Sequence, residues 1–218
     1  NILNFGLMEQ NLINMKLNSF ALETSSESMA PGGGSISAYC GVLGVSLGTM
    51  VANLSAHKRG WDEKWETFSE WAAKGMAYQE KLLNLVDEDT HAFNKIMSAY
   101  GLPKGSTEEV EIRSAAIQAA TKYAIEIPLN VARTAYQSME VMEAMVEIGN
   151  PNSITDAGVG AMCARTAVLG AIMNVKINTA DLNDKSYVAE VLEESAELTT
   201  KADLLEKRLR SAVDAAIS

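Results

Sequence analysis

Histidine and cysteine are scarce in this sequence, and their scarcity excludes several kinds of site. The only examples are His57, His91, Cys40 and Cys163. Zinc sites are built largely from these two residue types at short spacings. Neither cysteine has a histidine nearby in the sequence that could complete a metal site or a nucleophilic dyad. Both cysteines lie in apolar runs, which is typical of small buried side chains in a reducing compartment. The sequence therefore predicts a cytoplasmic protein without a metal site.

Positive charge is also in short supply. Lys and Arg number 18 against 28 Asp and Glu, which gives a formal net charge of −10, and there is no long basic tract. Nucleic-acid binding needs concentrated positive charge, so nucleic acid is not expected as a partner. An anionic small ligand remains compatible with this composition if a few basic residues cluster. Glycine and proline number 15 and 4, which is too few for a disordered or fibrous chain.

One stretch lacks charge altogether. Residues 35–54 contain no Asp, Glu, Lys or Arg, and they directly follow Pro31 and three consecutive glycines. Such a run is long enough to cross a membrane, and a glycine-rich turn before a helix can bind an anion through free N–H groups. However, small residues recur at helical spacing within the run, at Ser37, Gly41, Gly44, Gly48 and Ala52. This spacing favours a buried helix that another helix approaches closely, and no membrane partner is expected.

Helical spacing dominates the rest of the chain, and no alternating strand pattern stands out. The predicted helices cover about residues 9–24, 35–56, 62–100, 106–128, 128–148, 155 onward, and 183 to near the C-terminus. The sequence therefore predicts an all-α bundle of long helices. Residues 8–218 form its single domain, and residues 1–7 are interpreted as a leader or linker.

Local signals predict where several helices begin and end. Asp62 is suited to an N-cap, and Gly101 to the position after a helix C-terminus. Ser106 and Glu109 have the spacing of a capping box. Pro128 lacks an N–H group, so it should end or kink its helix.

Asp89 is a carboxylate on an apolar helix face. The third predicted helix has an apolar stripe, which consists of Tyr78, Leu82, Leu85, Phe93, Ile96 and Tyr100, and Asp89 falls within it. Its neighbours Asp87 and Glu88 point to other faces and are predicted to be solvated. Burial raises the pKa of a carboxyl group, which suits a general acid or base. Position alone favours a structural role instead, in an ion pair or at a helix N-terminus.

Asn174 and Asn178 are a second polar feature in an apolar setting. They lie one helical turn apart, close to an alanine stripe of the same predicted helix. Buried amides often satisfy structural hydrogen bonds, but two together can also bind the donor and acceptor edge of a heterocycle.

Several of these motifs occur in a characteristic order. They are Pro31-Gly32-Gly33-Gly34-Ser35, Met50–Leu54, Asp87–Phe93, Leu102-Pro103-Lys104, Pro128-Leu129, Gly149-Asn150, Thr155–Gly158 and Asn174–Asn178. As an ordered set, over roughly residues 15–185, they resemble the formiminotetrahydrofolate cyclodeaminase and methenyltetrahydrofolate cyclohydrolase family. The glycine triplet alone would not be specific.

The resemblance implies a metal-free, all-helical homodimer, or a higher even oligomer, with folate sites between subunits and no permanently bound cofactor. The expected reaction converts 5-formiminotetrahydrofolate to 5,10-methenyltetrahydrofolate and ammonia, a lyase step of one-carbon metabolism and histidine degradation. The substrate can carry a polyglutamate tail, and the domain can be fused to a formiminotransferase. One alternative is a methenyltetrahydrofolate cyclohydrolase on the same fold. Another, of a different class, is a helical interaction module without activity.

The resemblance also suggests roles for particular residues. Asp89 opens the family's D-x-x-A-F motif and is the expected catalytic residue, which moves protons between N10 and the departing amine. The backbone of Gly32, Gly33, Gly34 and Ser35 is expected to meet the substrate. The remaining expected substrate-binding residues are Lys58, Arg59 and Lys104, which would pair with folate carboxylates, and Asn53, Asp156, Asn174 and Asn178.

Overall fold

The computed structural model describes residues 11–218, and nearly all of these residues are helical. The helices are α1 (Leu17–Thr24), α2 (Gly33–Ala56), α3 (Trp65–Tyr100), α4 (Thr107–Ile148), α5 (Ile154–Thr179) and α6 (Lys185–Ile217). Short 3-10 turns occupy Leu12–Asn14, Asp62–Lys64 and Pro151–Ser153. No strand occurs in residues 11–218, so the prediction of an all-α fold is confirmed. The predicted leader at 1–7 lies outside the described residues.

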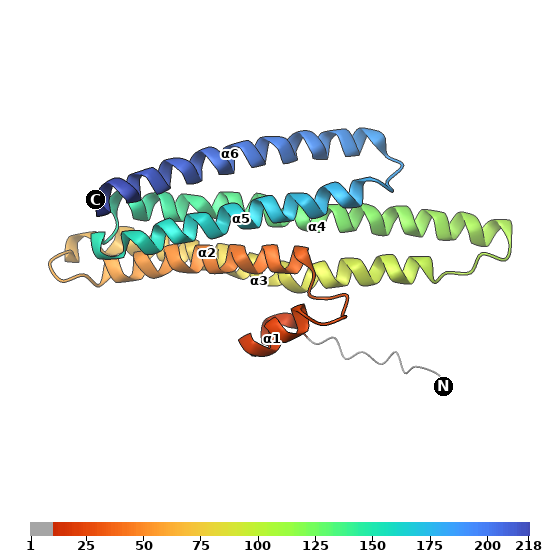
Figure 1. The fold of residues 1–218 in the computed structure, drawn as a ribbon, viewed down its shortest axis with the longest axis horizontal. Coiled ribbons are helices and arrows are strands. Elements are labelled where there is room, and N and C mark those ends of the chain that lie inside the picture. The colour runs from red at the N-terminus through yellow and green to blue at the C-terminus, as the bar shows by residue number, and fades with distance from the viewer. Residues whose placement is uncertain (1–10) are drawn as a thin grey trace.

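Helices α2 to α5 form the body of a long bundle (Figure 1). Helix α2 packs against α3 and α5, and α4 packs against the same two helices. Helix α6 lies along α4 and α5, whereas α1 lies outside the bundle near the N-terminal end of α2, where its Phe20 contacts Tyr39. The far ends of α3 and α4 project beyond the other helices together with the loop that joins them. The N-terminal end of α2 therefore lies in the interior of the bundle's length, not at its tip.

The small-residue stripe of α2 is a close contact with α5. A Cβ atom built on Gly44 would lie 2.7 Å from the carbonyl oxygen of Gly160, and one built on Gly160 would lie 2.7 Å from that of Gly44. Backbone cannot yield as a flexible side chain can, so both positions require glycine. Helices α2 and α5 are apolar and long enough to cross a membrane by composition alone, but 56% and 50% of their most apolar windows are buried inside the bundle. Core helices of a bundle have this composition too.

Pro128 does not end a helix, because α4 runs unbroken from Thr107 to Ile148. A proline at this position leaves the carbonyl of Ala124 without its usual helical donor. Asn178 of α5 supplies the missing bond, and its Nδ2 lies 2.8 Å from the Ala124 oxygen. The helix is therefore repaired by a side chain from a neighbouring helix.

Other local predictions had mixed outcomes. The capping box is confirmed, because Glu109 N–H donates to Ser106 Oγ at 3.2 Å and Ser106 N–H donates to Glu109 Oε2 at 3.0 Å. Asp62 is not the N-cap of α3. It begins a 3-10 turn, and α3 follows it without a side-chain cap. Gly101 ends α3, but with φ of −76° it does not use the left-handed conformation that favours glycine.

The first predicted helix is broken. Residues 12–14 form a 3-10 turn, Met15 and Lys16 are extended, and α1 covers only Leu17–Thr24. Residues 9 and 10 of that prediction lie outside the described residues. The break lets the chain turn from α3, which the 3-10 turn contacts, toward α1.

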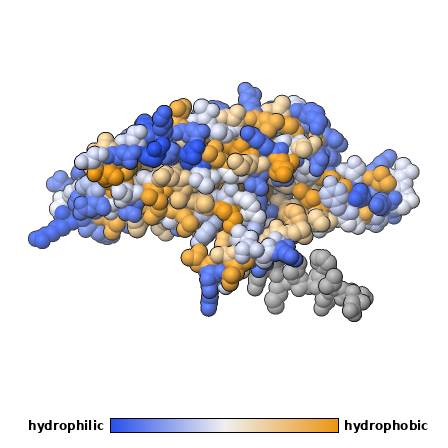
Figure 2. Space-filling view, viewed as in Figure 1, coloured by the Kyte–Doolittle hydropathy of each residue, from blue (hydrophilic) through white to orange (hydrophobic). Residues whose placement is uncertain are grey.

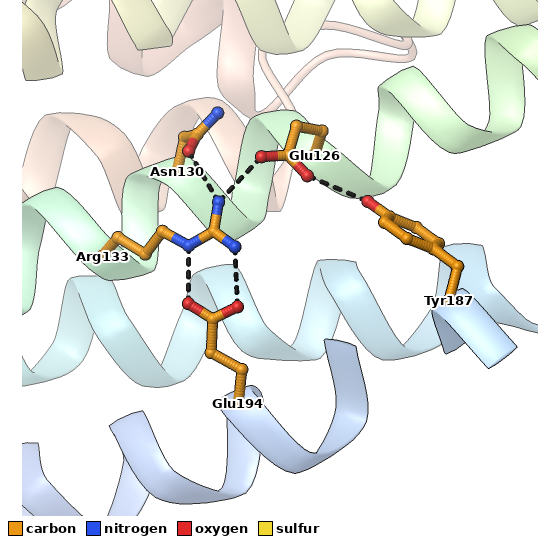
Figure 3. A network of polar contacts seen from close by, with 5 residues as sticks. All are labelled: Glu126, Asn130, Arg133, Tyr187 and Glu194. Atoms are coloured by element: carbon orange, nitrogen blue, oxygen red, sulfur yellow. Dashed lines mark hydrogen bonds and ion pairs between the residues drawn. The ribbon is translucent and has the colours of Figure 1, made fainter. Parts of the chain in front are cut away.

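Helix α6 is held to α4 by a half-buried polar network (Figure 3). Arg133 makes a two-pronged ion pair with Glu194, with both N···O distances at 2.6 Å. The same guanidinium donates to Glu126 at 2.7 Å and Asn130 at 3.1 Å, and the hydroxyl of Tyr187 donates to Glu126 at 2.9 Å. The hydrogen bonds from Arg133 hold the pKa of Glu194 below its usual value. Bidentate pairs of this kind fix geometry as well as charge, so the network sets the position of α6.

Candidate functional site

Asp89 extends from α3 to the N-terminus of α2. Its Oδ2 accepts a hydrogen bond from the Ser35 N–H at 2.8 Å and another from the Ser35 hydroxyl at 3.0 Å. The N-cap of α2 is Gly32, which has no side chain to satisfy the free N–H groups of the first turn. Asp89 therefore caps α2 from another helix, and the structural role left open by the sequence is real.

The second carboxylate oxygen of Asp89 has a different environment. A Cβ atom built on Gly34 would lie 2.0 Å from Asp89 Oδ1, so Gly34 leaves the space that this oxygen occupies. Within residues 11–218, no group donates a hydrogen bond to Oδ1. One oxygen of Asp89 is thus fixed to α2, and the other is available to a ligand.

The pKa of Asp89 is raised above that of an ordinary aspartate. Burial is the main cause, because it disfavours the charged carboxylate. The two hydrogen bonds from Ser35 act in the opposite direction, but they do not cancel the effect of burial. A carboxyl group whose pKa moves toward neutrality is suited to accept and return a proton.

A cavity of about 210 Å³ lies beside Asp89. It contains six of the predicted site residues, which are Gly32, Gly33, Gly34, Asp89, Asn174 and Asn178, and its other lining residues are Met29, Ala30, Thr90, Ala92, Phe93, Ile96 and Ala124. Ser35 adjoins this set through its bonds to Asp89. The structure therefore brings together residues from the glycine loop, α3 and α5 that are far apart in the sequence. We call it the Asp89 cavity.

The side-chain amides of Asn174 and Asn178 each donate a hydrogen bond to a backbone carbonyl, and their side-chain oxygens stay free within the described part of the chain. The amide nitrogen of Asn174 donates to the Gly170 carbonyl at 2.9 Å, and that of Asn178 donates to Ala124, as described above. Their side-chain oxygens accept no hydrogen bond from any residue that the structure describes. Both roles considered from the sequence are therefore compatible, because each amide is held by its nitrogen while its oxygen can accept a bond from a ligand.

Four other predicted residues lie far from Asp89 within the chain. Lys58 and Arg59 follow the C-terminus of α2, Asn53 is in its last turn, and Asp156 is in the first turn of the antiparallel α5. Helix α2 has 24 residues and is therefore about 36 Å long. A single copy of the chain does not bring these residues to the cavity, so their role in a substrate site between subunits stays a prediction.

The surroundings of these residues are also different. Asn53 lines a separate shallow pocket of about 440 Å³ with His57 and Gln79. The amino group of Lys58 lies 4.1 Å from the centre of the Trp61 ring. Lys104 is exposed in the loop between α3 and α4 and does not line the Asp89 cavity.

The sequence predicted that Asp87 and Glu88 are solvated, but both accept hydrogen bonds from other parts of the chain. Asp87 Oδ1 accepts a hydrogen bond from the Leu12 N–H at 2.7 Å, which holds the N-terminal segment to α3. Glu88 accepts a hydrogen bond from the Tyr123 hydroxyl of α4 and lies 3.1 Å from His91 Nδ1. These two contacts, with Tyr123 as the larger cause, lower the pKa of Glu88. Adjacent carboxylates thus fix three different segments around the cavity.

The apolar stripe that contains Asp89 also differs from the prediction. Val86 and Ala92, three residues to either side of Asp89, are buried, whereas Tyr100 is 48% exposed. Thr90 lines the cavity and was missed, because a threonine beside an aspartate carries no distinctive sequence signal.

Comparison with known proteins now identifies the family. The Formiminotransferase-cyclodeaminase family model matches residues 16–197. The chain belongs to this family. A formiminotetrahydrofolate cyclodeaminase from Thermotoga maritima has the same fold, with a TM-score of 0.82 and 25% identity over 94% of this chain and 98% of that one.

Curated members of the family carry two different names. A methenyltetrahydrofolate cyclohydrolase of Methylorubrum extorquens is 32% identical over 205 residues, which is 94% of this chain and 99% of that protein. A formimidoyltransferase-cyclodeaminase of Rattus norvegicus is 34% identical over 179 residues, which is 82% of this chain but 33% of that protein. The chain therefore spans about a third of the rat enzyme and nearly all of the bacterial one.

Proposed function

We propose that the Asp89 cavity binds a one-carbon derivative of tetrahydrofolate and that Asp89 transfers protons at its one-carbon group. The observation that carries this proposal is the desolvated carboxyl group of Asp89, with one oxygen fixed by Ser35 and the other available. The free side-chain oxygens of Asn174 and Asn178 support it, because a reduced pterin ring presents several N–H donors along its edges. The names of the relatives support the same substrate class.

The leading reaction is that of a cyclodeaminase. N10 of 5-formiminotetrahydrofolate attacks the formimino carbon and forms a C–N bond, and the C–N bond to the amine then breaks. Asp89 accepts the proton that N10 loses and delivers it to the departing amine, so that ammonia and 5,10-methenyltetrahydrofolate result. Such proton transfer accelerates a reaction by about 10²- to 10⁴-fold. The cavity contributes the rest by holding N10 near the carbon.

A second candidate reaction is that of a methenyltetrahydrofolate cyclohydrolase. Here water attacks the methenyl carbon, and Asp89 moves a proton from the water to the ring nitrogen that leaves. The observation in its favour is the match to the Methylorubrum cyclohydrolase over 99% of that protein. Both reactions need a proton carrier at the same carbon, so one cavity suits either of them.

We further propose that the protein works as a homodimer through an apolar surface of α2 and α5. This α2–α5 face consists of Leu43, Met50 and Leu54 on α2 and Val159, Met162, Met173 and Ile177 on α5, all of them exposed. Figure 2 shows apolar residues gathered over these two helices. Contiguous apolar surface of this kind is typical of an interface.

A second copy would also address the separation of the predicted site residues. If two α2 helices pack antiparallel across a twofold axis, the C-terminal end of each lies beside the N-terminal end of the other. Lys58 and Arg59 of one copy would then approach the Asp89 cavity of the other. Their positive charge suits the carboxylates of the folate's glutamate, in a protein with a net charge of −10.

The proposed function is tested with two substrates. The absorbance of 5,10-methenyltetrahydrofolate is followed from 5-formiminotetrahydrofolate and, separately, from the methenyl compound itself, and ammonia is measured in parallel. A cyclodeaminase produces ammonia and the methenyl compound in equal amounts. A cyclohydrolase consumes the methenyl compound faster than buffer does. A folded protein with neither activity would leave the interaction module as the remaining alternative.

A further inference from the structure

Thr90 has a hydroxyl group with no partner. Its Oγ1 is shielded from solvent and makes no hydrogen bond to any residue in the described part of the chain. Only one other side chain there has a buried polar atom in this state, which is Ser195 of α6. Thr90 lines the Asp89 cavity, and Ser195 does not. Buried polar groups in proteins are nearly always paired, so each exception calls for an explanation.

Other hydroxyl side chains show how a helix of this protein normally satisfies such a group. Thr49, Ser55 and Thr166 each donate to the carbonyl four residues earlier, at 2.8, 2.7 and 3.0 Å. The corresponding acceptor for Thr90 is the carbonyl of Val86, but Thr90 does not use it. Its hydroxyl is therefore left without a partner although an ordinary local acceptor lies one turn away.

An unpaired and dehydrated hydroxyl lowers the stability of the empty protein and favours binding. A ligand that pairs with it does not have to displace water from it, so the hydrogen bond contributes almost fully to affinity. Among residues 11–218, Thr90 is the only hydroxyl side chain that lines the cavity. The other polar side chains there present free acceptor oxygens, from Asp89, Asn174 and Asn178. A hydroxyl adds a donor to this set of acceptors.

We propose that the Thr90 side chain turns into the Asp89 cavity on binding, so that its hydroxyl becomes a binding contact for the folate. This inference rests on the proposed function and adds a residue that determines affinity for the same ligand. A lactam edge of the kind that a pterin ring carries combines N–H groups with a carbonyl oxygen. The amide oxygens suit the N–H groups, and the Thr90 hydroxyl suits the carbonyl.

The test compares Thr90→Val, which keeps the shape of the side chain, with Thr90→Ser, which keeps its hydroxyl. We expect Thr90→Val to lower kcat/KM by about 10- to 100-fold, the usual effect of losing a hydrogen bond to a ligand. Its dissociation constant for 5-formyltetrahydrofolate, a stable one-carbon folate, should rise by a similar factor in calorimetry. Its melting temperature should be unchanged or higher, because an unpaired buried hydroxyl has been removed. Thr90→Ser should restore most of the affinity.

Ser195→Ala is the matched control, because it removes the other unpaired buried hydroxyl outside the cavity. It should leave kcat/KM and folate binding within twofold of the wild type. The inference is wrong if wild-type protein is active and Thr90→Val stays within twofold of it, or if Thr90→Val loses activity only by unfolding. A wild-type protein that neither binds 5-formyltetrahydrofolate nor turns over either substrate ends the proposed function, and this inference ends with it.

Discussion

The two ends of α2 differ in what they offer a ligand. At the N-terminal end, Asp89, Asn174 and Asn178 surround a partly enclosed cavity that no basic residue from the described part of the chain lines. At the C-terminal end, Lys58 and Arg59 provide positive charge beside a shallow pocket, and none of its lining residues within 11–218 is a carboxylate. One end therefore has the group for proton transfer, and the other has the charge for an anionic tail. Neither end alone is suited to a complete folate, which is the reason for placing the site between two copies.

The largest effect is expected from Asp89→Asn, which removes the proton carrier from the cavity end. Activity should fall by about 10²- to 10⁴-fold. The stability of the folded protein, in contrast, should not fall at neutral pH. Folding raises the pKa of Asp89, so the stability that this group contributes is present below its unfolded pKa and is lost as pH rises through the folded pKa.

Asp89→Asn removes that loss, so it should melt at or above the wild-type temperature at neutral pH and should have no such advantage in acid. Thermal unfolding at the two pH values measures this. A variant that keeps full activity would contradict the catalytic assignment.

A smaller loss is expected from Gly34→Ala, which sharpens the claim that the glycine loop shapes the position of Asp89. The new Cβ would meet Asp89 Oδ1 at 2.0 Å and would force the carboxylate to move. We expect kcat/KM to fall at least about tenfold, because a displacement of this size disrupts a reacting geometry. Gly101→Ala is the control, since its Cβ would be no closer than 3.4 Å to a neighbour. Equal kcat/KM values for the two variants would contradict the claim that Gly34 is needed to position Asp89.

Asn178 and Pro128 should show coupled effects on stability. Asn178→Ala leaves the Ala124 carbonyl without a donor and should destabilise the protein by about 1–3 kcal/mol. In the Pro128→Ala background the backbone N–H returns, so the same change should cost much less. Denaturant unfolding of the four proteins gives the coupling energy. Simple additivity would mean that Asn178 does not repair α4.

The sequence predicted those features whose causes are local. The Ser106 capping box was readable because its two partners lie three residues apart. Asp89 was identified because helical periodicity placed it on an apolar face. The continuity of α4 at Pro128 was not readable, because its cause is Asn178, 54 residues from Ala124.

The separation of Lys58 from Gly33 follows from the sequence, because the predicted helix between them is long. The partners of Asp87 and Glu88 were missed because solvation is the usual state of adjacent acidic residues, and only the fold brings Leu12 and Tyr123 to them.

The smallest effect is expected from Ser35→Ala, which sharpens the description of the cavity end. The Ser35 hydroxyl lowers the pKa of Asp89, so its loss should raise that pKa further. If the ionised carboxylate is the active form, the acidic limb of the kcat/KM profile should move to higher pH. Ser37→Ala is the control, because that hydroxyl donates to the Gly33 carbonyl and not to Asp89. A limb that stays in place or moves to lower pH would contradict the assignment.

The central claim, that a complete site joins opposite ends of two α2 helices, has one direct test. Asp89→Asn and the double variant Lys58→Glu, Arg59→Glu are each expected to be nearly inactive alone. When the two proteins are mixed and their subunits exchange, half of the dimers are mixed, and one site in each has both intact ends. We predict that activity returns to about a quarter of the wild-type value. Mixtures no more active than their components would contradict the claim.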